Sequence, residues 1–100
     1  FATAQQDMKS RALVEAQVDA DRMILAIQSA LDADADLLTS SERVLTDRLI
    51  AALSDARING DAVSIEAATQ ALAKGTEAFA AQRMNRGIQK ALAGKNIESV

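Results

Sequence analysis

The stretch from Arg11 to Leu31 constrains the fold most, because it contains no glycine or proline and repeats apolar residues at helical spacing. Residues three, four and seven positions apart lie on one side of an α-helix. Such a stripe is formed by Ala20, Met23, Ile24, Ile27, Ala30 and Leu31. We therefore predict one long helix over residues 2–33, whose second half packs against other helices.

The rest of the chain also favours helices over strands. It has no proline, four glycines and 2% aromatic residues, and alanine supplies much of its 49% apolar content. Alanine favours helix, whereas strands are enriched in β-branched and aromatic residues. We predict an all-α fold with a single domain over residues 1–100, since a chain of this length holds one core. Because it starts with Phe1 rather than methionine, we expect it to be a fragment of a larger protein.

A second helix has a recognisable start and end. Thr39 is followed three residues later by Glu42, which fits a capping box, and Asn59-Gly60 is a typical helix end. This pattern predicts a helix over residues 40–58.

A third helix is predicted over residues 62–93, with Asp61 as its N-cap. Gly87 suggests a bend near residues 84–87, which would make the last segment a short fourth helix. Gly75 also interrupts this helix, either as a tolerated weak position or to allow close contact with a neighbouring helix.

Short connections favour an antiparallel three-helix bundle. The first helix is longer than the second, so its N-terminal half is expected to protrude from the bundle. That half has an apolar face that we expect to contact another surface, or a second copy of the chain. The face comprises Met8, Leu13, Val14 and Val18.

The composition excludes most catalytic and metal sites, because the chain has neither cysteine nor histidine. Asp32, Asp34 and Asp36 have the spacing that opens a calcium-binding EF-hand loop, but Leu37 and Arg43 occupy the positions that require glycine and glutamate. We interpret the acidic segment as a solvated turn. The sequence predicts no catalytic residue, no metal, no cofactor in this chain and no enzyme activity of its own.

Charge and hydropathy give no sign of nucleic-acid or membrane binding. The net charge is −3, and no apolar run approaches the roughly 20 residues that span a bilayer. We interpret a basic cluster near the C-terminus as complementing a helix dipole rather than as a phosphate-binding patch. The cluster comprises Arg83, Arg86, Lys90 and Lys95.

Three stretches carry a resemblance to a known family. The residues from Leu13 through Asp21 to Leu31 resemble the long lid helix of DnaK-like (Hsp70) heat-shock chaperones. The segment LLTSSER at 37–43 and the segment FAAQRM at 79–84 are most similar to the HscA-type branch, which serves iron–sulfur cluster assembly.

The resemblance implies that the chain is the C-terminal helical lid of a substrate-binding domain, which closes over a client peptide in a β-sandwich groove. It also implies a cytoplasmic, bacterial parent chaperone with ATP bound in a separate nucleotide-binding domain. The partners would be an IscU-like scaffold protein and an HscB-like J-domain cochaperone. Asp21 matches the position of a lid latch that pairs with an arginine of the β-sandwich. The alternative is a helical protein–protein interaction module, or adaptor.

Overall fold

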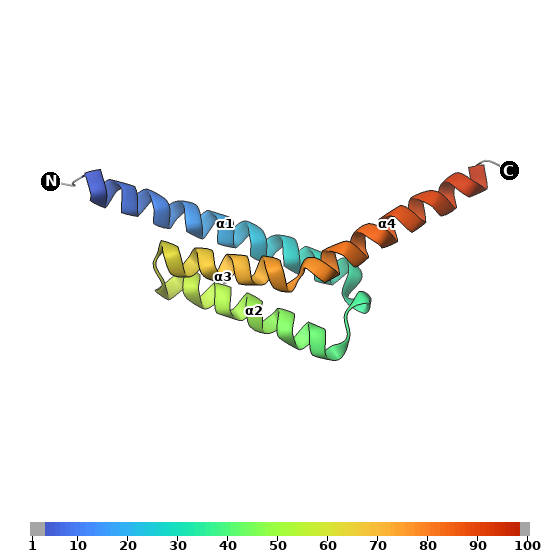
Figure 1. The fold of residues 1–100 in the computed structure, drawn as a ribbon, viewed down its shortest axis with the longest axis horizontal. Helices are drawn as coiled ribbons and strands as arrows, with labels where there is room; N and C mark the ends of the chain where they lie inside the picture. Colours follow the sequence, from blue (N-terminus) through green and yellow to red (C-terminus); the bar gives the residue numbers. More distant parts are fainter. Residues whose placement is uncertain (1–3, 99–100) are drawn as a thin grey trace.

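The structure, a computed structural model, consists of helices and describes the backbone of residues 4–98 and the side chains of residues 8–93. Its elements are α1 (Ala4–Asp34), the short 3₁₀-helix η1 (Ala35–Leu37), α2 (Ser40–Asn59), α3 (Ala62–Gly75) and α4 (Glu77–Glu98). Helices α1, α2 and α3 lie side by side as an antiparallel bundle, and α4 diverges from it (Figure 1). The prediction of an all-α bundle is confirmed.

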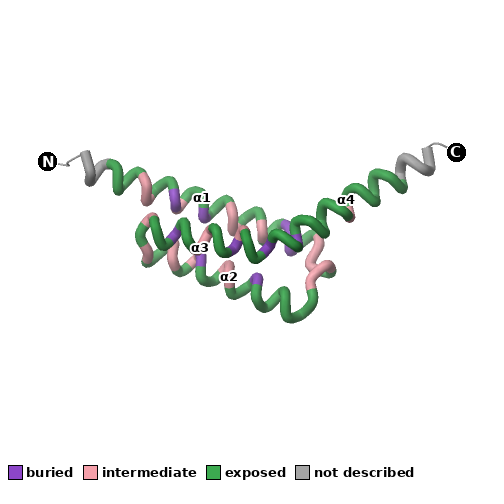
Figure 2. The backbone as a smooth tube through the Cα atoms, in the orientation of Figure 1, coloured by how far each residue is buried: buried purple, intermediate pink, exposed green. Residues whose placement is uncertain are grey.

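The bundle is held by a small apolar core between its three helices. Ala16 and Ala20 of α1 pack there with Leu53 of α2 and with Ile65 and Leu72 of α3. The two alanines lack long side chains, so α1 can lie close to its neighbours. A second cluster at the far end contains Ala30, Leu31 and Phe79, and it anchors the start of α4. Buried positions are accordingly concentrated in the bundle (Figure 2).

The capping box that the sequence predicted is present at the start of α2. The backbone N–H of Glu42 donates to Thr39 Oγ1 at 3.2 Å, and the backbone N–H of Thr39 donates to Glu42 Oε1 at 2.9 Å. Asp61 likewise caps α3, accepting from the N–H of Ser64 at 2.9 Å. The ends of α1 and α2 fall within one residue of their predicted positions. The predicted start of the first helix at residue 2 lies outside the described residues.

The predicted third helix over residues 62–93 is wrong, because the chain breaks at Thr76 into two helices. The Thr76 hydroxyl donates to the carbonyl of Leu72 at 2.8 Å, and its backbone N–H is shared between the carbonyls of Leu72 and Ala73. Such local bonding by threonine competes with regular helix, but Thr46 and Thr69 make the same side-chain bond within unbroken helices. What distinguishes the break at Thr76 is that Phe79, three residues later, packs against Ala30 and Leu31 at the end of α1. The bend predicted near 84–87 is also wrong, since α4 continues through Gly87 and is longer than the short fourth helix we expected.

Gly75 beside this break is a position of close helix contact. A Cβ atom at Gly75 would collide with Cδ1 of Leu49 on α2. Of the two interpretations of this glycine, the structure favours the one in which it lets a neighbouring helix approach.

The molecule is elongated because α4 leaves the bundle after its first turns. Its dimensions are 71 × 30 × 17 Å and its radius of gyration is 18.1 Å, against about 13 Å for a compact domain of this length. The starts of α1 and α3 lie at one end of the bundle, and α4 extends in the opposite direction (Figure 1).

The protruding part of α1 is shorter than the sequence predicted. We expected the whole first half to be free, but Ala16 is buried and Leu13 packs against the bundle core. The turn between α2 and α3 lies beside the N-terminal half of α1, because Asp61 and Val63 line the same hollow as Lys9 and Leu13.

Candidate functional site

An exposed apolar stripe runs along α1 on the side turned away from the bundle. Val14 and Val18 are four residues apart, and Leu25 follows seven residues later, so all three lie on one side of the helix. Each is exposed, whereas the core residues Ala16 and Ala20 lie on the opposite side. We call Val14, Val18 and Leu25 the outer face of α1.

This surface only partly matches the predicted face. Val14 and Val18 belong to it, but Leu13 faces the core. Met8 is exposed but lies six residues before Val14, which places it about 120° around the helix. Leu25 was missed, although its distance of seven residues from Val18 could have indicated it.

Asp21 lies beside the outer face and is already paired with an arginine of the same chain. Arg57 Nη2 of α2 donates to Asp21 Oδ2 at 3.0 Å, and Arg57 Nε lies 2.5 Å from Oδ1. The pair joins α1 to α2 near the end of the bundle where α2 turns into α3. The carboxylate remains about half exposed, so a second cation can still reach it. The role of Arg57 was not predicted, because its partner is 36 residues away in the sequence.

A second ion-pair network joins the end of α1 and η1 to α4. Arg83 Nε donates to Asp34 Oδ2 at 2.8 Å, and Arg86 Nη1 donates to Asp34 Oδ1 at 2.9 Å. Arg86 also donates two hydrogen bonds to Asp36, from Nη1 to Oδ1 at 2.9 Å and from Nη2 to Oδ2 at 2.6 Å. We call these four residues the clamp.

The clamp corrects two interpretations of the sequence. Asp34 and Asp36 do not belong to a merely solvated turn, and Arg83 and Arg86 bind these carboxylates instead of simply complementing a helix dipole. Hydrogen bonds from Arg83 and Arg86 lower the pKa of Asp34, and those from Arg86 lower the pKa of Asp36. The same carboxylates raise the pKa of Arg86. Two of the basic groups considered for phosphate binding are thus engaged within the chain.

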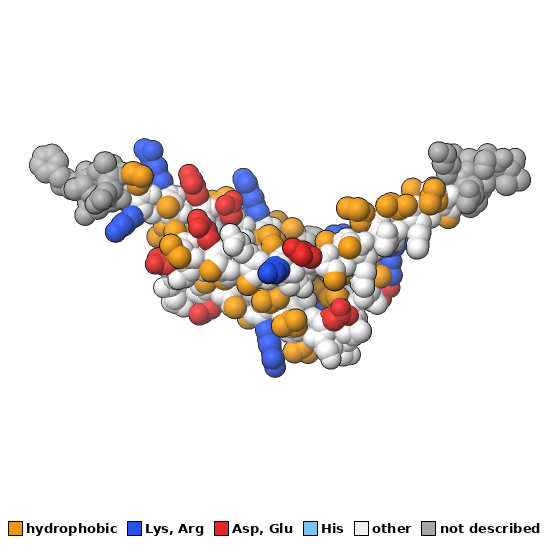
Figure 3. Space-filling view, in the orientation of Figure 1, with side chains coloured by type: hydrophobic (Ala, Val, Ile, Leu, Met, Phe, Trp, Pro, Cys, Tyr) orange, Lys and Arg blue, Asp and Glu red, His pale blue; other side chains and the backbone are white. Residues whose placement is uncertain are grey.

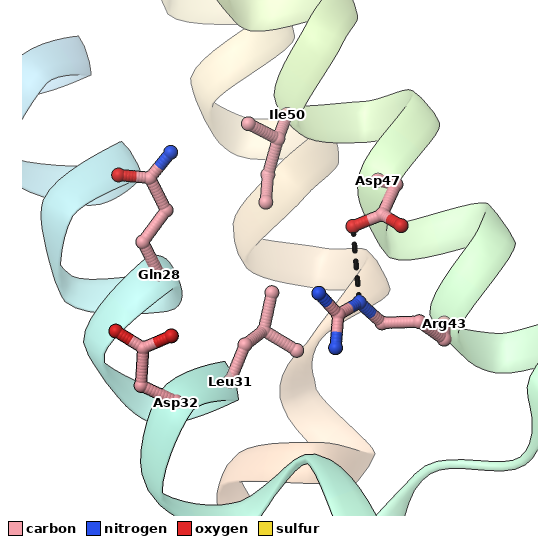
Figure 4. Close-up of a pocket in the computed structure, with 6 residues that line it drawn as sticks. All are labelled: Gln28, Leu31, Asp32, Arg43, Asp47 and Ile50. Atoms are coloured by element: carbon pink, nitrogen blue, oxygen red, sulfur yellow. Dashed lines mark hydrogen bonds and ion pairs between the residues drawn. The ribbon is translucent and has the colours of Figure 1, made fainter.

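A hollow between α1 and α2 shows no arrangement suited to catalysis (Figure 4). Arg43 Nε donates to Asp47 Oδ1 at 3.1 Å along the α2 side of the hollow, and Leu31 and Ile50 point into the space between the two helices. The acids that line it, Asp32 and Asp47, come from different helices, and Asp47 is paired with Arg43. The residues that line the hollow include no hydroxyl, thiol or lysine side chain, so it holds no nucleophile beside a base.

Two further features of the described residues limit the kinds of site present. Within residues 8–93 no three acidic side chains converge in a way that could hold a metal ion. No helix described by the structure is both long enough and apolar enough to cross a bilayer.

Comparison with known proteins places this chain beside one kind of chaperone. It is 64% identical over 101 residues to the chaperone protein HscA homologue of Acidovorax sp., and 64% identical over 100 residues to that of Delftia acidovorans. The HscA homologue of Burkholderia thailandensis is 50% identical over 100 residues. No family model matches the chain.

Each alignment covers all of this chain but only 16% of the relative. The matched part is a C-terminal piece of the longer chaperone. The resemblance drawn from the sequence is therefore confirmed: over its whole length, the chain is similar to a C-terminal piece of HscA-type Hsp70 chaperones.

Proposed function

We propose that this chain is the lid of the substrate-binding domain of an HscA-type chaperone, and that it slows the release of a bound client peptide. The proposal is carried by the similarity of all 100 residues to a C-terminal segment of HscA homologues. The geometry supports it, because the bundle supports a long helix whose outer face no other described part of the chain covers.

The outer face of α1 supplies the free energy of closure in this proposal. Val14, Val18 and Leu25 are each roughly half exposed or more. Burying a whole side chain of this kind contributes about 1.5–3 kcal/mol, so covering the exposed part of each contributes about 1 kcal/mol. Three such residues would favour the closed lid by about 3 kcal/mol, or roughly a hundredfold.

Asp21 is proposed to act as a latch toward an arginine of the β-sandwich outside this chain. Its carboxylate is held by Arg57 and remains partly exposed at the edge of the outer face. Arg57 then positions the carboxylate and also competes for it. Removing Asp21 should accelerate peptide release, while Arg57→Ala should slow release by leaving the carboxylate free. Equal acceleration by both changes would mean that Asp21 only stabilises the bundle.

The wider setting follows from the family alone. We propose that the parent chaperone acts in the bacterial cytoplasm in the maturation of iron–sulfur proteins, with an IscU-like scaffold as client and an HscB-like J-domain cochaperone. ATP would bind a separate nucleotide-binding domain outside these 100 residues, so this segment itself is not an enzyme.

The test is the release rate of a labelled client peptide from the full-length parent chaperone at fixed nucleotide. Truncation before this segment and the double change Val18→Asp/Leu25→Asp should both accelerate release, by on the order of tenfold or more. Val44→Asp is the matched control, because Val44 is also exposed but lies on α2. Unchanged release in both altered proteins would reject the lid and favour the adaptor.

A further inference from the structure

The part of α4 that leaves the bundle carries a second exposed apolar stripe. It is formed by Met84, Ile88 and Leu92, which are 69%, 50% and 53% exposed. Figure 3 shows hydrophobic side chains gathered along one edge of this helix. Apolar side chains at a spacing of four residues on a projecting helix indicate a contact surface. We call these three residues the α4 stripe.

The clamp fixes the direction in which the α4 stripe points. Phe79, Arg83 and Arg86 share one side of α4, where Phe79 is buried and both arginines bind Asp34. At 100° per residue, Ile88 lies on the opposite side from Phe79. The stripe therefore faces away from the bundle, and the bundle's own core cannot cover it while the clamp is closed.

The surroundings of the stripe favour an uncharged partner. Within residues 80–93, its neighbours on that side of α4 are Ala81, Asn85 and Ala91, which carry no charge. Arg83 and Arg86 lie on the other side and are neutralised by Asp34 and Asp36. An acidic helix or an anionic surface would find little to recognise there, whereas an identical neutral stripe would meet no like charge.

The stripe is also self-complementary under a two-fold axis. Met84 and Leu92 each lie four residues from Ile88, so an antiparallel copy places Ile88 against Ile88 and Met84 against Leu92. A contact of this kind uses the same patch on both copies and closes after two.

We propose that the α4 stripe is a self-association surface through which two copies of this chain pair antiparallel about Ile88. Residues 80–93 span only about 20 Å of helix. Two such short helices bury less surface than the roughly 1,200 Å² found in a stable interface. The dimer is therefore weak and forms only at high protein concentration. The proposal does not depend on the lid function.

Cysteine cross-linking of the 100-residue chain tests the pairing, because the chain has no cysteine of its own. Under mild oxidation, Ile88→Cys should form a disulfide-linked dimer. Met84→Cys alone and Leu92→Cys alone should not, but a mixture of the two should. If Met84→Cys and Leu92→Cys each formed a disulfide-linked dimer alone, and their mixture formed no disulfide between the two variants, the pairing would be parallel. That result would overturn the proposed geometry. Preferential linking of Val18→Cys would move the interface to α1 and overturn the proposal.

Sedimentation equilibrium measures the association without cross-links. Ile88→Asp should raise the dissociation constant of the dimer at least about tenfold, which corresponds to a loss of about 1.4 kcal/mol of binding free energy. Val44→Asp, at an equally exposed position on α2, should leave it unchanged. Unchanged helicity by circular dichroism checks that both variants fold. If the 100-residue chain remained a monomer at millimolar concentration, the proposal would be overturned. It would also be overturned if Ile88→Cys formed no disulfide-linked dimer in a full-length chaperone that has no other cysteine.

Discussion

At the scale of single residues, the bundle depends on three large side chains with no exposed surface, Leu53, Ile65 and Leu72. Leu53 reaches the core from α2 and meets Ala16 and Ala20 of α1. Shortening this fully buried side chain to alanine leaves a cavity between the three helices. Leu53→Ala should therefore lower the free energy of unfolding by about 2–5 kcal/mol, measured by urea denaturation.

Leu45 provides the matched control for this change. It lies on the same helix but is exposed. Leu45→Ala should change the free energy of unfolding by no more than about 0.5 kcal/mol. Similar losses for the two variants would mean that α2 contacts something through Leu45 and that the core is not where we place it.

At the scale of the helix, the start of α2 depends on the capping box of Thr39 and Glu42. Thr39→Ala removes the oxygen that accepts the N–H of Glu42, and loss of such a cap costs about 1 kcal/mol. The midpoint of thermal unfolding should fall accordingly. Ser41→Ala in the first turn is the control, and an equal fall there would show that the cap contributes nothing specific.

The direction of α4 depends on the clamp, and Arg86→Ala should release it. Arg86 makes three of the four hydrogen bonds that join α4 to Asp34 and Asp36, leaving Arg83 alone. Spin labels on cysteines at Gln70 of α3 and Gln89 of α4 should give one narrow distance distribution in the starting chain and a broad one in the variant. The measurement belongs at a concentration where the chain is monomeric.

Arg43→Ala is the control for the clamp, since Arg43 pairs with Asp47 within α2. It should leave the distance distribution narrow. If Arg86→Ala also leaves it narrow, Phe79 and the chain around Thr76 fix α4 without the clamp.

The parts predicted correctly from the sequence are those that depend on nearby residues. The capping box connects residues three apart, and the stripe of α1 repeats every three or four residues, so both can be found along the chain. The clamp joins residues about 50 apart, and Arg57 meets Asp21 only after folding. The break at Thr76 was missed because its hydroxyl bond to Leu72 is one that Thr46 and Thr69 also make within unbroken helices, so it gives no signal of a break. The anchoring of Phe79 against Ala30 and Leu31 joins residues far apart in the sequence.

At the scale of the whole molecule, the stability of the fold should decrease in acid but should not change with pH around neutrality. The pKa values of Asp34, Asp36, Glu42 and Asp61 are lowered, by arginines at the clamp and by backbone N–H groups at the two helix caps. A carboxyl with a lowered pKa binds its proton less readily in the folded state, so acid favours unfolding. The chain has no histidine to titrate between pH 6 and 8.

Thermal unfolding should therefore keep a constant midpoint from pH 8 to about pH 5, above the ordinary pKa values of 4.5 for Glu42 and 3.8 for the aspartates. The midpoint should fall as the pH drops through these values and below, where the carboxyls take up protons. Asp34→Asn/Asp36→Asn removes two of these four carboxyls with a lowered pKa. The variant should therefore have a lower unfolding midpoint at pH 7, and its midpoint should fall less as the pH drops below about 5. A variant with the same acid dependence as the starting chain would show that the clamp does not couple α4 to the stability of the bundle, and α4 would then be an arm that moves without unfolding it.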